Sequence, residues 1–233
     1  MTRALLFDLD GTLCLMDADS FTKAYLNEMA KSFSDVILEE QFLPSVMKST
    51  MFCINHPSEH YSCYDVFLHH FCEGFGLDPQ AIKDRMMQFY RNDFPKYGKM
   101  ITKLPLTEDV IRSAKQKGFL LALASNSLMP QFSMAERIRW CGLDPHDFDF
   151  IPGVEFMHYA KPNPKYFQEI AKHLGVTDMN QCMMIGNSLE EDMVAADIGM
   201  QTFLIAEGPY IEDLEKVNYH GTLKDLLEMI NEW

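Results

Sequence analysis

Short apolar runs alternate with segments of helical periodicity along most of the chain. Four runs are continuous and apolar, as expected of strands that are buried on both faces, and cover residues 4–7, 119–124, 182–185 and 202–205. A weaker candidate strand covers residues 148–151. Helical patterns cover residues 106–117, 130–141, 164–174 and 189–198, each followed by glycine, and a last one follows Thr222 over residues 223–233. The alternation predicts a Rossmann-like α/β fold, a parallel sheet with helices on both faces.

Residues 14–103 follow a different pattern and contain no comparable apolar run. Their apolar side chains recur at intervals of three and four, for example at Phe21, Tyr25 and Met29, which is typical of helices. We therefore expect an α-helical domain over residues 14–103, inserted into an α/β core domain that consists of residues 1–13 and 104–233. Each part reaches or approaches the usual size of a domain.

Charge and composition exclude several classes of partner. The 233 residues include 20 Lys and Arg against 34 Asp and Glu, a formal net charge of −14, which argues against nucleic acids and anionic membranes. No apolar run approaches the roughly 20 residues that span a bilayer, and the first run becomes acidic at Asp8 instead of continuing as a signal sequence. The six cysteines mostly lie in apolar periodic segments, which fits a reducing compartment. We expect a cytoplasmic monomer or weak homodimer.

Two carboxylates follow the first predicted strand, in the segment FDLDGT of residues 7–12. Ligands of open α/β sheets bind at the carboxyl ends of the strands, and a spacing of two places both carboxylates on one face if the strand continues. Such a pair either binds a metal or divides the work of nucleophile and acid/base. Taken alone, however, the segment is more typical of a turn that closes a strand.

Three further motifs, in order along the chain, make the sequence similar to phosphatases of the haloacid dehalogenase-like superfamily. The Asp-x-Asp-Gly-Thr motif of that superfamily begins at Asp8, and its Ser at the end of the next core strand matches Ser125. Its Lys, commonly followed by Pro, matches Lys161, and its acidic loop after a further strand matches residues 185–192. The motifs span nearly the whole chain. The resemblance implies that the helical insert is a cap that closes over the active site and selects the substrate.

The resemblance also implies a role for each motif residue. Asp8 would be the nucleophile that forms an aspartyl-phosphate, and Asp10 would protonate the leaving oxygen and later deprotonate the attacking water. The phosphate oxygens would be held by Thr12, Ser125, Asn126 and Lys161. The cofactor would be Mg²⁺, bound by Asp8, the backbone carbonyl of Asp10, Asn187 and Asp192.

Asn187 departs from the family pattern, which usually has Asp at this position. A neutral amide removes one negative charge from the surroundings of the metal, so we expect Mg²⁺ dependence to persist with weaker affinity. Asp192 would then carry more of the metal binding, with Glu190 or Glu191 as a replacement ligand.

The resemblance therefore predicts a Mg²⁺-dependent phosphatase acting on a small phosphorylated metabolite. Two alternatives stay open, a phosphomutase of the same fold and a non-catalytic binding or regulatory protein. The presence of Asp10 argues against a dehalogenase, because displacement of a halide needs no protonated leaving group. A structural zinc site is a less favoured alternative, because the ligand-like spacing of Cys53, His56, His60 and Cys63 lies in an insert that needs no metal to fold.

Overall fold

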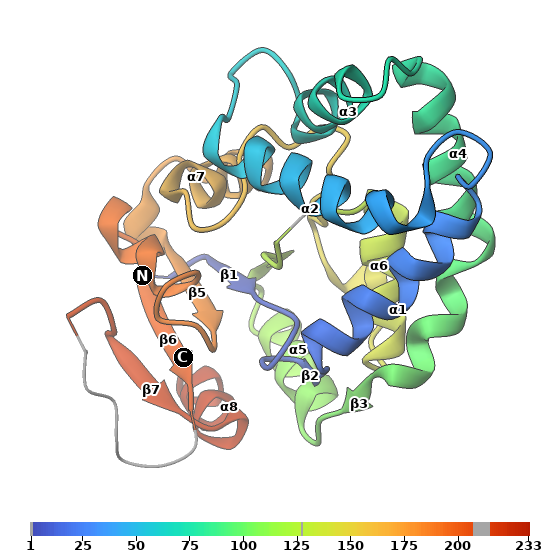
Figure 1. The fold of residues 1–233 in the computed structure, drawn as a ribbon. Helices are drawn as coiled ribbons and strands as arrows, with labels where there is room; N and C mark the ends of the chain where they lie inside the picture. Colours follow the sequence, from blue (N-terminus) through green and yellow to red (C-terminus); the bar gives the residue numbers. More distant parts are fainter. Residues whose placement is uncertain (1, 127, 207–214) are drawn as a thin grey trace.

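A computed structural model describes residues 2–126, 128–206 and 215–233 of the protein. Five parallel strands form one sheet in the order β4-β1-β5-β6-β7 (Figure 1). The strands are β1 (Ala4–Phe7), β4 (Leu120–Leu123), β5 (Cys182–Gly186), β6 (Gln201–Ile205) and β7 (Tyr219–Gly221). The predicted α/β class with a parallel sheet is confirmed.

Alternate residues of the central strand contact two different cores, as the side-chain period of two requires. Leu5 and Phe7 of β1 pack with helices α5 (Thr107–Gln116), α6 (Gln131–Trp140) and α8 (Leu223–Glu232). Ala4 and Leu6 face the opposite side and pack with α7 (Pro164–His173) and the 3₁₀ helix η4 (Met193–Ile198). Helices therefore cover both faces of the sheet, as the alternation of strands and helices predicted.

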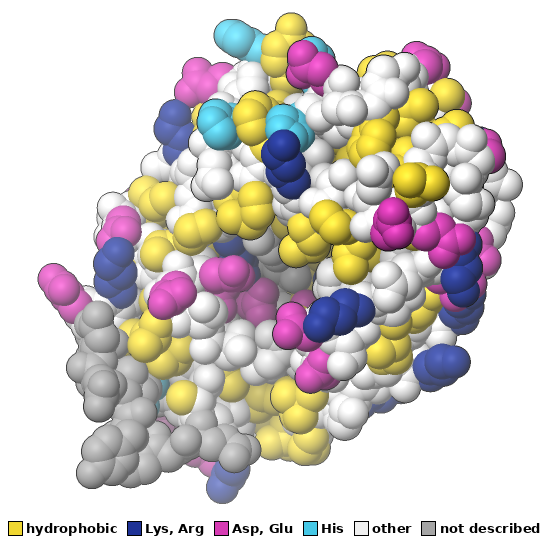
Figure 2. Space-filling model, in the orientation of Figure 1, with side chains coloured by type: hydrophobic (Ala, Val, Ile, Leu, Met, Phe, Trp, Pro, Cys, Tyr) yellow, Lys and Arg dark blue, Asp and Glu magenta, His cyan; other side chains and the backbone are white. Residues whose placement is uncertain are grey.

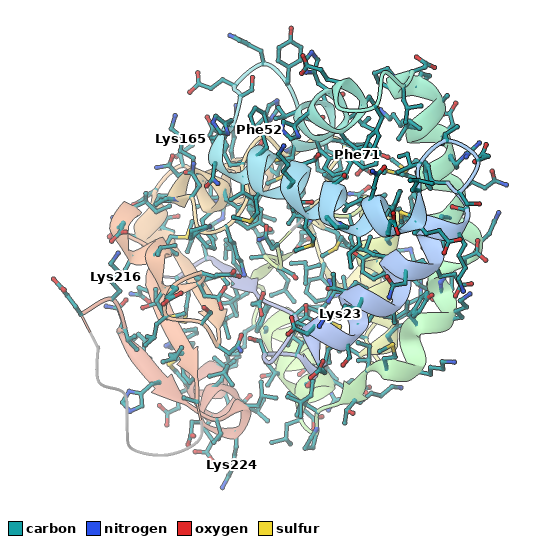
Figure 3. All side chains as sticks on the ribbon, viewed as in Figure 1. Lys23, Phe52, Phe71, Lys165, Lys216 and Lys224 are labelled. Atoms are coloured by element: carbon teal, nitrogen blue, oxygen red, sulfur yellow. The ribbon has the colours of Figure 1, made fainter. Side chains whose placement is uncertain are left out.

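The chain between β1 and β4 is mostly helical, and we call residues 18–100 the helical segment. It consists of α1 (Ala18–Lys31), α2 (Glu39–Asn55), α3 (Cys63–Glu73), α4 (Pro79–Asn92) and the 3₁₀ helix η1 (Phe94–Met100). In Figure 1 its four α-helices lie together, apart from β5, β6 and β7. Phe71, labelled in Figure 3, contacts the rings of Phe42, Phe67 and Phe75 within the segment.

Side-chain caps fix where several of these helices begin. Asp17 accepts a hydrogen bond of 2.7 Å from the backbone N–H of Ser20 at the start of α1. Thr222, the residue before the last helix, forms a reciprocal capping box with Asp225 at the start of α8. These bonds satisfy backbone donors that a helix start leaves without partners.

Several local predictions differ from the structure. The predicted helix over residues 189–198 is reduced to the short η4, and turns precede it. The weaker strand over residues 148–151 contributes a single bridge, between Phe150 and Ala122. The pattern missed β7 and two short strands, β2 (Cys14–Leu15) and β3 (Thr102–Lys103), which pair antiparallel at the two ends of the helical segment. No helix in the described ranges has the length and apolar character of a membrane span.

Candidate active site

Three neighbouring strands bring the sequence motifs to one edge of the sheet. β1 lies between β4 and β5, and its last residue, Phe7, is in register with residues at the ends of both neighbours. Asp8 directly follows β1, Ser125 lies just beyond β4, and the loop of residues 187–192 follows β5. Because parallel strands end at the same edge, motifs far apart in sequence meet there.

Lys161 joins the first motif to the last. Its side chain is 1% exposed, and its Nζ donates a hydrogen bond of 2.8 Å to Oδ1 of Asp8 and another to Oδ1 of Asp192. The second oxygen of Asp192, Oδ2, accepts hydrogen bonds of 3.0 Å from the backbone N–H groups of Asn187 and Ser188. One buried ammonium is therefore shared by two carboxylates, and one of these also fixes the loop after β5.

Thr12 extends the same network to the amide of Asn187. Its Oγ1 lies 3.3 Å from Oδ2 of Asp8 and 3.4 Å from Oδ1 of Asn187. Glycines permit two close approaches here, one between the loop after β1 and Asn187, and one between the end of β5 and Asp192 in the loop that follows it. A Cβ on Gly11, which has φ +80°, would lie 2.3 Å from Nδ2 of Asn187, and one on Gly186 would lie 2.2 Å from Oδ2 of Asp192.

Asp10 lies outside this network and is paired with a residue that the sequence analysis missed. Nη2 of Arg137, on α6, lies 2.5 Å from both carboxylate oxygens of Asp10. Arg137 is buried, and its guanidinium lies over the ring of Phe21 in α1, 5.6 Å from the centroid. The one available signal was its place between Met134 and Ile138 on the apolar face of a predicted helix, which does not identify a partner.

Ser125 and Asn126 lie beside the network without joining it. The backbone carbonyl of Ser125 accepts a hydrogen bond of 2.5 Å from the hydroxyl of Tyr166, which fixes the loop after β4. Oδ1 of Asn126 is buried and has no hydrogen-bond partner within the described ranges. Of the eight residues singled out in the sequence, hydrogen bonds thus connect five in one network, namely Asp8, Thr12, Lys161, Asn187 and Asp192.

Comparison with known proteins identifies the family. Residues 2–197 match the family model of haloacid dehalogenase-like hydrolases. The chain belongs to this family. A glyceraldehyde 3-phosphate phosphatase of Methanothermobacter thermautotrophicus is 25% identical over 244 residues, which cover 97% of this chain and 100% of that protein. The haloacid dehalogenase-like hydrolase domain-containing protein 3 of Bos taurus is 32% identical over 133 residues, 57% of this chain and 50% of the relative.

Solved structures show the same fold. A 2-haloacid dehalogenase from Pseudomonas syringae pv. Tomato DC3000 superimposes with a TM-score of 0.64 at 19% identity and covers 100% of both chains. A HAD phosphatase from Thermococcus onnurineus gives a TM-score of 0.61 at 20% identity over 98% of both chains. At these identities the likeness establishes the architecture of the hydrolase, and its chemistry has to be argued from its own residues.

Burial dominates the electrostatics of the site in this hydrolase. Burial raises the pKa of Asp8 to about 6, although Lys161 acts to lower it; the neighbouring carboxylate of Asp192 raises it further. Burial alone would lower the pKa of Lys161, but the two carboxylates hold it above its ordinary value. Two buried carboxylates thus face a single buried ammonium, so a further cation beside them would be stabilised.

The oxygen atoms at this edge suit Mg²⁺, which prefers oxygen ligands and keeps several waters. The residues that could hold it are Asp8, Asp192, Asn187 and Asp10, the last through its backbone carbonyl. No three His, Cys, Asp or Glu side chains in the described part of the chain form a metal-binding group, so the amide, the carbonyl and water would complete the shell. Asn187 and the two alternative ligands, Glu190 and Glu191, are all exposed.

The geometry does not support the zinc alternative in the helical segment. Cys53 and Cys63 are buried, and Sγ of Cys53 donates to the backbone carbonyl of Cys63 at 3.3 Å. His56 and His60 are both exposed, and Nδ1 of His56 lies 2.9 Å from the backbone carbonyl of Phe52. In the described residues these four side chains form no ligand group, so ordinary packing accounts for them.

A cavity of about 400 Å³ separates the strand ends from the helical segment. Asp10, Asn126, Arg137 and Glu191 line it on the side of the sheet, and side chains of all four α-helices line it on the other side. Figure 2 shows the surface hollowed in this region, with acidic side chains near the hollow and hydrophobic ones above it. The arrangement leaves room for a ligand that reaches both Asp10 and the helices.

Proposed function

We propose that this hydrolase is a Mg²⁺-dependent phosphatase that acts on a small phosphorylated metabolite through an aspartyl-phosphate on Asp8. The observation that carries the proposal is the buried network at the edge of the sheet, in which Asp8 and Asp192 share the ammonium of Lys161. A carboxylate nucleophile beside a fixed positive charge is what phosphoryl transfer requires. Full-length similarity to a glyceraldehyde 3-phosphate phosphatase supports the same reaction class.

In the proposed mechanism, a carboxylate oxygen of Asp8 attacks phosphorus, and the bond from phosphorus to the leaving oxygen breaks as Asp10 gives that oxygen a proton. Asp10 then takes a proton from the water that hydrolyses the aspartyl-phosphate, which restores both residues. Lys161, together with Thr12, Ser125 and Asn126, would hold the phosphate oxygens. Mg²⁺, when bound, would neutralise negative charge on the phosphate and on the carboxylates of the site.

Arg137 would position Asp10 in this mechanism. Asp10 is the candidate acid/base and also lines the cavity, so its carboxylate has to face the leaving group. The guanidinium contacts both oxygens of Asp10 and is itself fixed by burial and by the ring of Phe21. A carboxylate held in this way loses little conformational freedom when the substrate arrives.

The helical segment would serve as the cap of the enzyme. We propose a core domain of residues 1–13 and 104–233 and a cap domain of residues 14–103, with the paired strands β2 and β3 at the two crossing points. A cap over the strand ends would exclude water from the site and position the organic part of the substrate.

Hydrolysis of acetyl phosphate, measured with Mg²⁺ and with EDTA, tests the reaction. We expect turnover that needs Mg²⁺, loss of turnover in Asp8→Asn, and normal turnover in Asp19→Asn, an exposed aspartate that serves as the matched control. Mass spectrometry of acid-quenched wild type should find a phosphate adduct on Asp8. Absence of hydrolysis by the wild type with Mg²⁺, of acetyl phosphate and of alkyl phosphates alike, would overturn the proposed function, and full activity of Asp8→Asn would overturn the role of Asp8.

The metal assignment has its own test at Asn187. Replacing the amide with a carboxylate adds a negative charge beside the proposed metal ligands, so Asn187→Asp should lower the Mg²⁺ concentration that gives half-maximal activity. Asn55→Asp, at an exposed position in α2, is the matched control and should leave that concentration unchanged. An unchanged Mg²⁺ requirement in Asn187→Asp would contradict the placement of the metal beside this residue.

A further inference from the structure

The cavity beyond the strand ends has a strongly apolar wall. The helical segment contributes most of it, and the apolar lining residues include Phe21, Leu26, Met29, Val46, Phe67 and Met86. Its volume, about 400 Å³, is at the lower end of the ~300–1,000 Å³ found for small-molecule sites. Three of the lining residues are methionines of the segment, whose unbranched side chains adapt to ligands of different outline.

The charges that line the cavity disfavour a second anionic group on the substrate. Among the described lining residues, Arg137 is the one cation, and it already contacts both oxygens of Asp10. The other charged lining residues, Asp10 and Glu191, are acidic. A substrate that carried a carboxylate or a second phosphate in addition to the reacting group would therefore meet negative charge without a free positive partner.

Apolar side chains outnumber hydroxyl-bearing ones on the helical side of the cavity, which limits the partners for the hydroxyl groups of a sugar. The hydroxyl-bearing lining residues on this side are Thr22, Tyr25, Thr50, Tyr64 and Tyr90, and the hydroxyl of Tyr64 is buried without a partner within the described ranges. The other ten lining residues on this side are apolar. Each substrate hydroxyl that is buried without a partner loses its hydrogen bonds to water, so a polyhydroxylated group would bind poorly here.

We propose, on the basis of the phosphatase function proposed above, that the organic group of the substrate is uncharged and largely apolar. The reacting phosphate would lie at the strand ends beside Asp8 and Lys161, and the apolar group would fill the space under α1, α2, α3 and α4. The substrate class is a monophosphate ester of an aliphatic or aromatic alcohol small enough for a cavity of about 400 Å³, in contrast to sugar phosphates, bisphosphates and phosphorylated acids.

A matched pair of substrates tests this class with the wild-type enzyme alone. Cyclohexylmethyl phosphate and glucose 6-phosphate are both primary alkyl phosphates with a six-membered ring, and they differ chiefly in the ring oxygen and ring hydroxyls. We expect kcat/KM to be at least tenfold higher for cyclohexylmethyl phosphate, since the apolar ring is transferred from water to an apolar wall without loss of hydrogen bonds. Equal values, or a preference for glucose 6-phosphate, would overturn the proposal.

A pair of variants on α2 locates the effect in the cavity. Thr50 lines the cavity, whereas its neighbour Met51 is 50% exposed and does not line it. Thr50→Trp would fill part of the space, so the ratio of kcat/KM for cyclohexylmethyl phosphate to that for acetyl phosphate should fall at least tenfold. Met51→Trp adds the same side chain outside and should preserve the ratio. An unchanged ratio in Thr50→Trp, with a folded circular dichroism spectrum, would contradict the proposed binding space.

Acetyl phosphate separates the two proposals. If the wild type with Mg²⁺ hydrolyses neither acetyl phosphate nor the two ring esters, the phosphatase function itself is wrong. If it hydrolyses acetyl phosphate and shows no preference for the apolar ring, the phosphatase function stands and the apolar substrate class is wrong. Hydrolysis of acetyl phosphate together with a tenfold preference for cyclohexylmethyl phosphate would support both.

Discussion

The raised pKa of Asp8 predicts that this residue destabilises the metal-free fold at neutral pH. Asp8 has a pKa of about 6 in the folded protein against an ordinary value of 3.8, so the folded state binds its proton more tightly than the unfolded state does. The stability that this provides is present in full below about pH 3.8 and is lost as the pH rises through about 6. Asn has the shape of Asp and cannot ionise, so Asp8→Asn should not lose this stability as the pH rises.

The size of the effect follows from the difference between the two pKa values. At about 1.4 kcal/mol for each pKa unit, the difference corresponds to about 3 kcal/mol in the free energy of unfolding. The linkage relation gives a loss of about 1 kcal/mol in the free energy of unfolding at pH 4.5, and nearly the full loss is reached by about pH 7. In EDTA, Asp8→Asn should therefore be more stable than the wild type by about 3 kcal/mol at pH 8 and by about 1 kcal/mol at pH 4.5.

Urea unfolding of both proteins in EDTA, followed by circular dichroism at half-unit steps from pH 4.5 to 8, measures the difference directly. Asp19→Asn controls for the removal of an exposed aspartate and should track the wild type. Mg²⁺ at pH 8 should narrow the gap, because a bound cation favours the ionised carboxylate. A gap between Asp8→Asn and the wild type that stays constant with pH would refute the reasoning, since it would show that burial does not perturb Asp8.

Three further predictions concern buried polar groups. Lys161→Met leaves two buried carboxylates without their shared ammonium, and urea unfolding in EDTA at pH 8 should show a loss of about 3–5 kcal/mol; a loss below about 1 kcal/mol would contradict the network. Arg137→Met should lower kcat for cyclohexylmethyl phosphate, whose alkoxide leaving group needs the proton of Asp10, by about tenfold to a hundredfold because Asp10 loses its positioning partner, and unchanged kcat would remove Arg137 from the mechanism. Tyr64 is 4% exposed and its hydroxyl has no hydrogen-bond partner within the described ranges, so Tyr64→Phe should stabilise the fold by about 1 kcal/mol against urea; a destabilised variant would reveal a partner.

The strands that could be predicted from the sequence are those buried on both faces. All four residues of β1 are buried, and so are all five of β5, so their sequences are continuous apolar runs. β7 breaks this rule because its side chains are exposed, such as that of Tyr219; it lies at one edge of the sheet and pairs only with β6 within the described sheet. Its three residues carry no apolar pattern, and only pairing with β6 makes them a strand.

Some residues of the candidate site could likewise be predicted from the sequence, and others could not. Asp8 and the loop that contains Asn187 could be predicted, because both follow predicted strands and parallel strands end at the same edge of the sheet. The partner of Asp10 depends instead on how α6 packs near the end of β1. That helix contains more than one arginine, and the sequence does not show which of them contacts Asp10. Arg137 is 4% exposed, whereas Arg139 is exposed and pairs with Glu136. Tertiary packing decides between them.

Phe21 shows why helical periodicity predicted helices between β1 and β4 but could not separate the residues that pack in their core from those that line the cavity. It is 1% exposed and contacts the rings of Tyr25, Phe94 and Trp140, so its apolar character is that of an ordinary core residue. It also lines the cavity and lies beneath the guanidinium of Arg137. Trp140 and Arg137 both belong to α6, and Arg137 contacts Asp10. Phe21 therefore packs α1 against the helix whose arginine positions Asp10. The position of the candidate acid/base therefore depends on how the helical segment packs against α6.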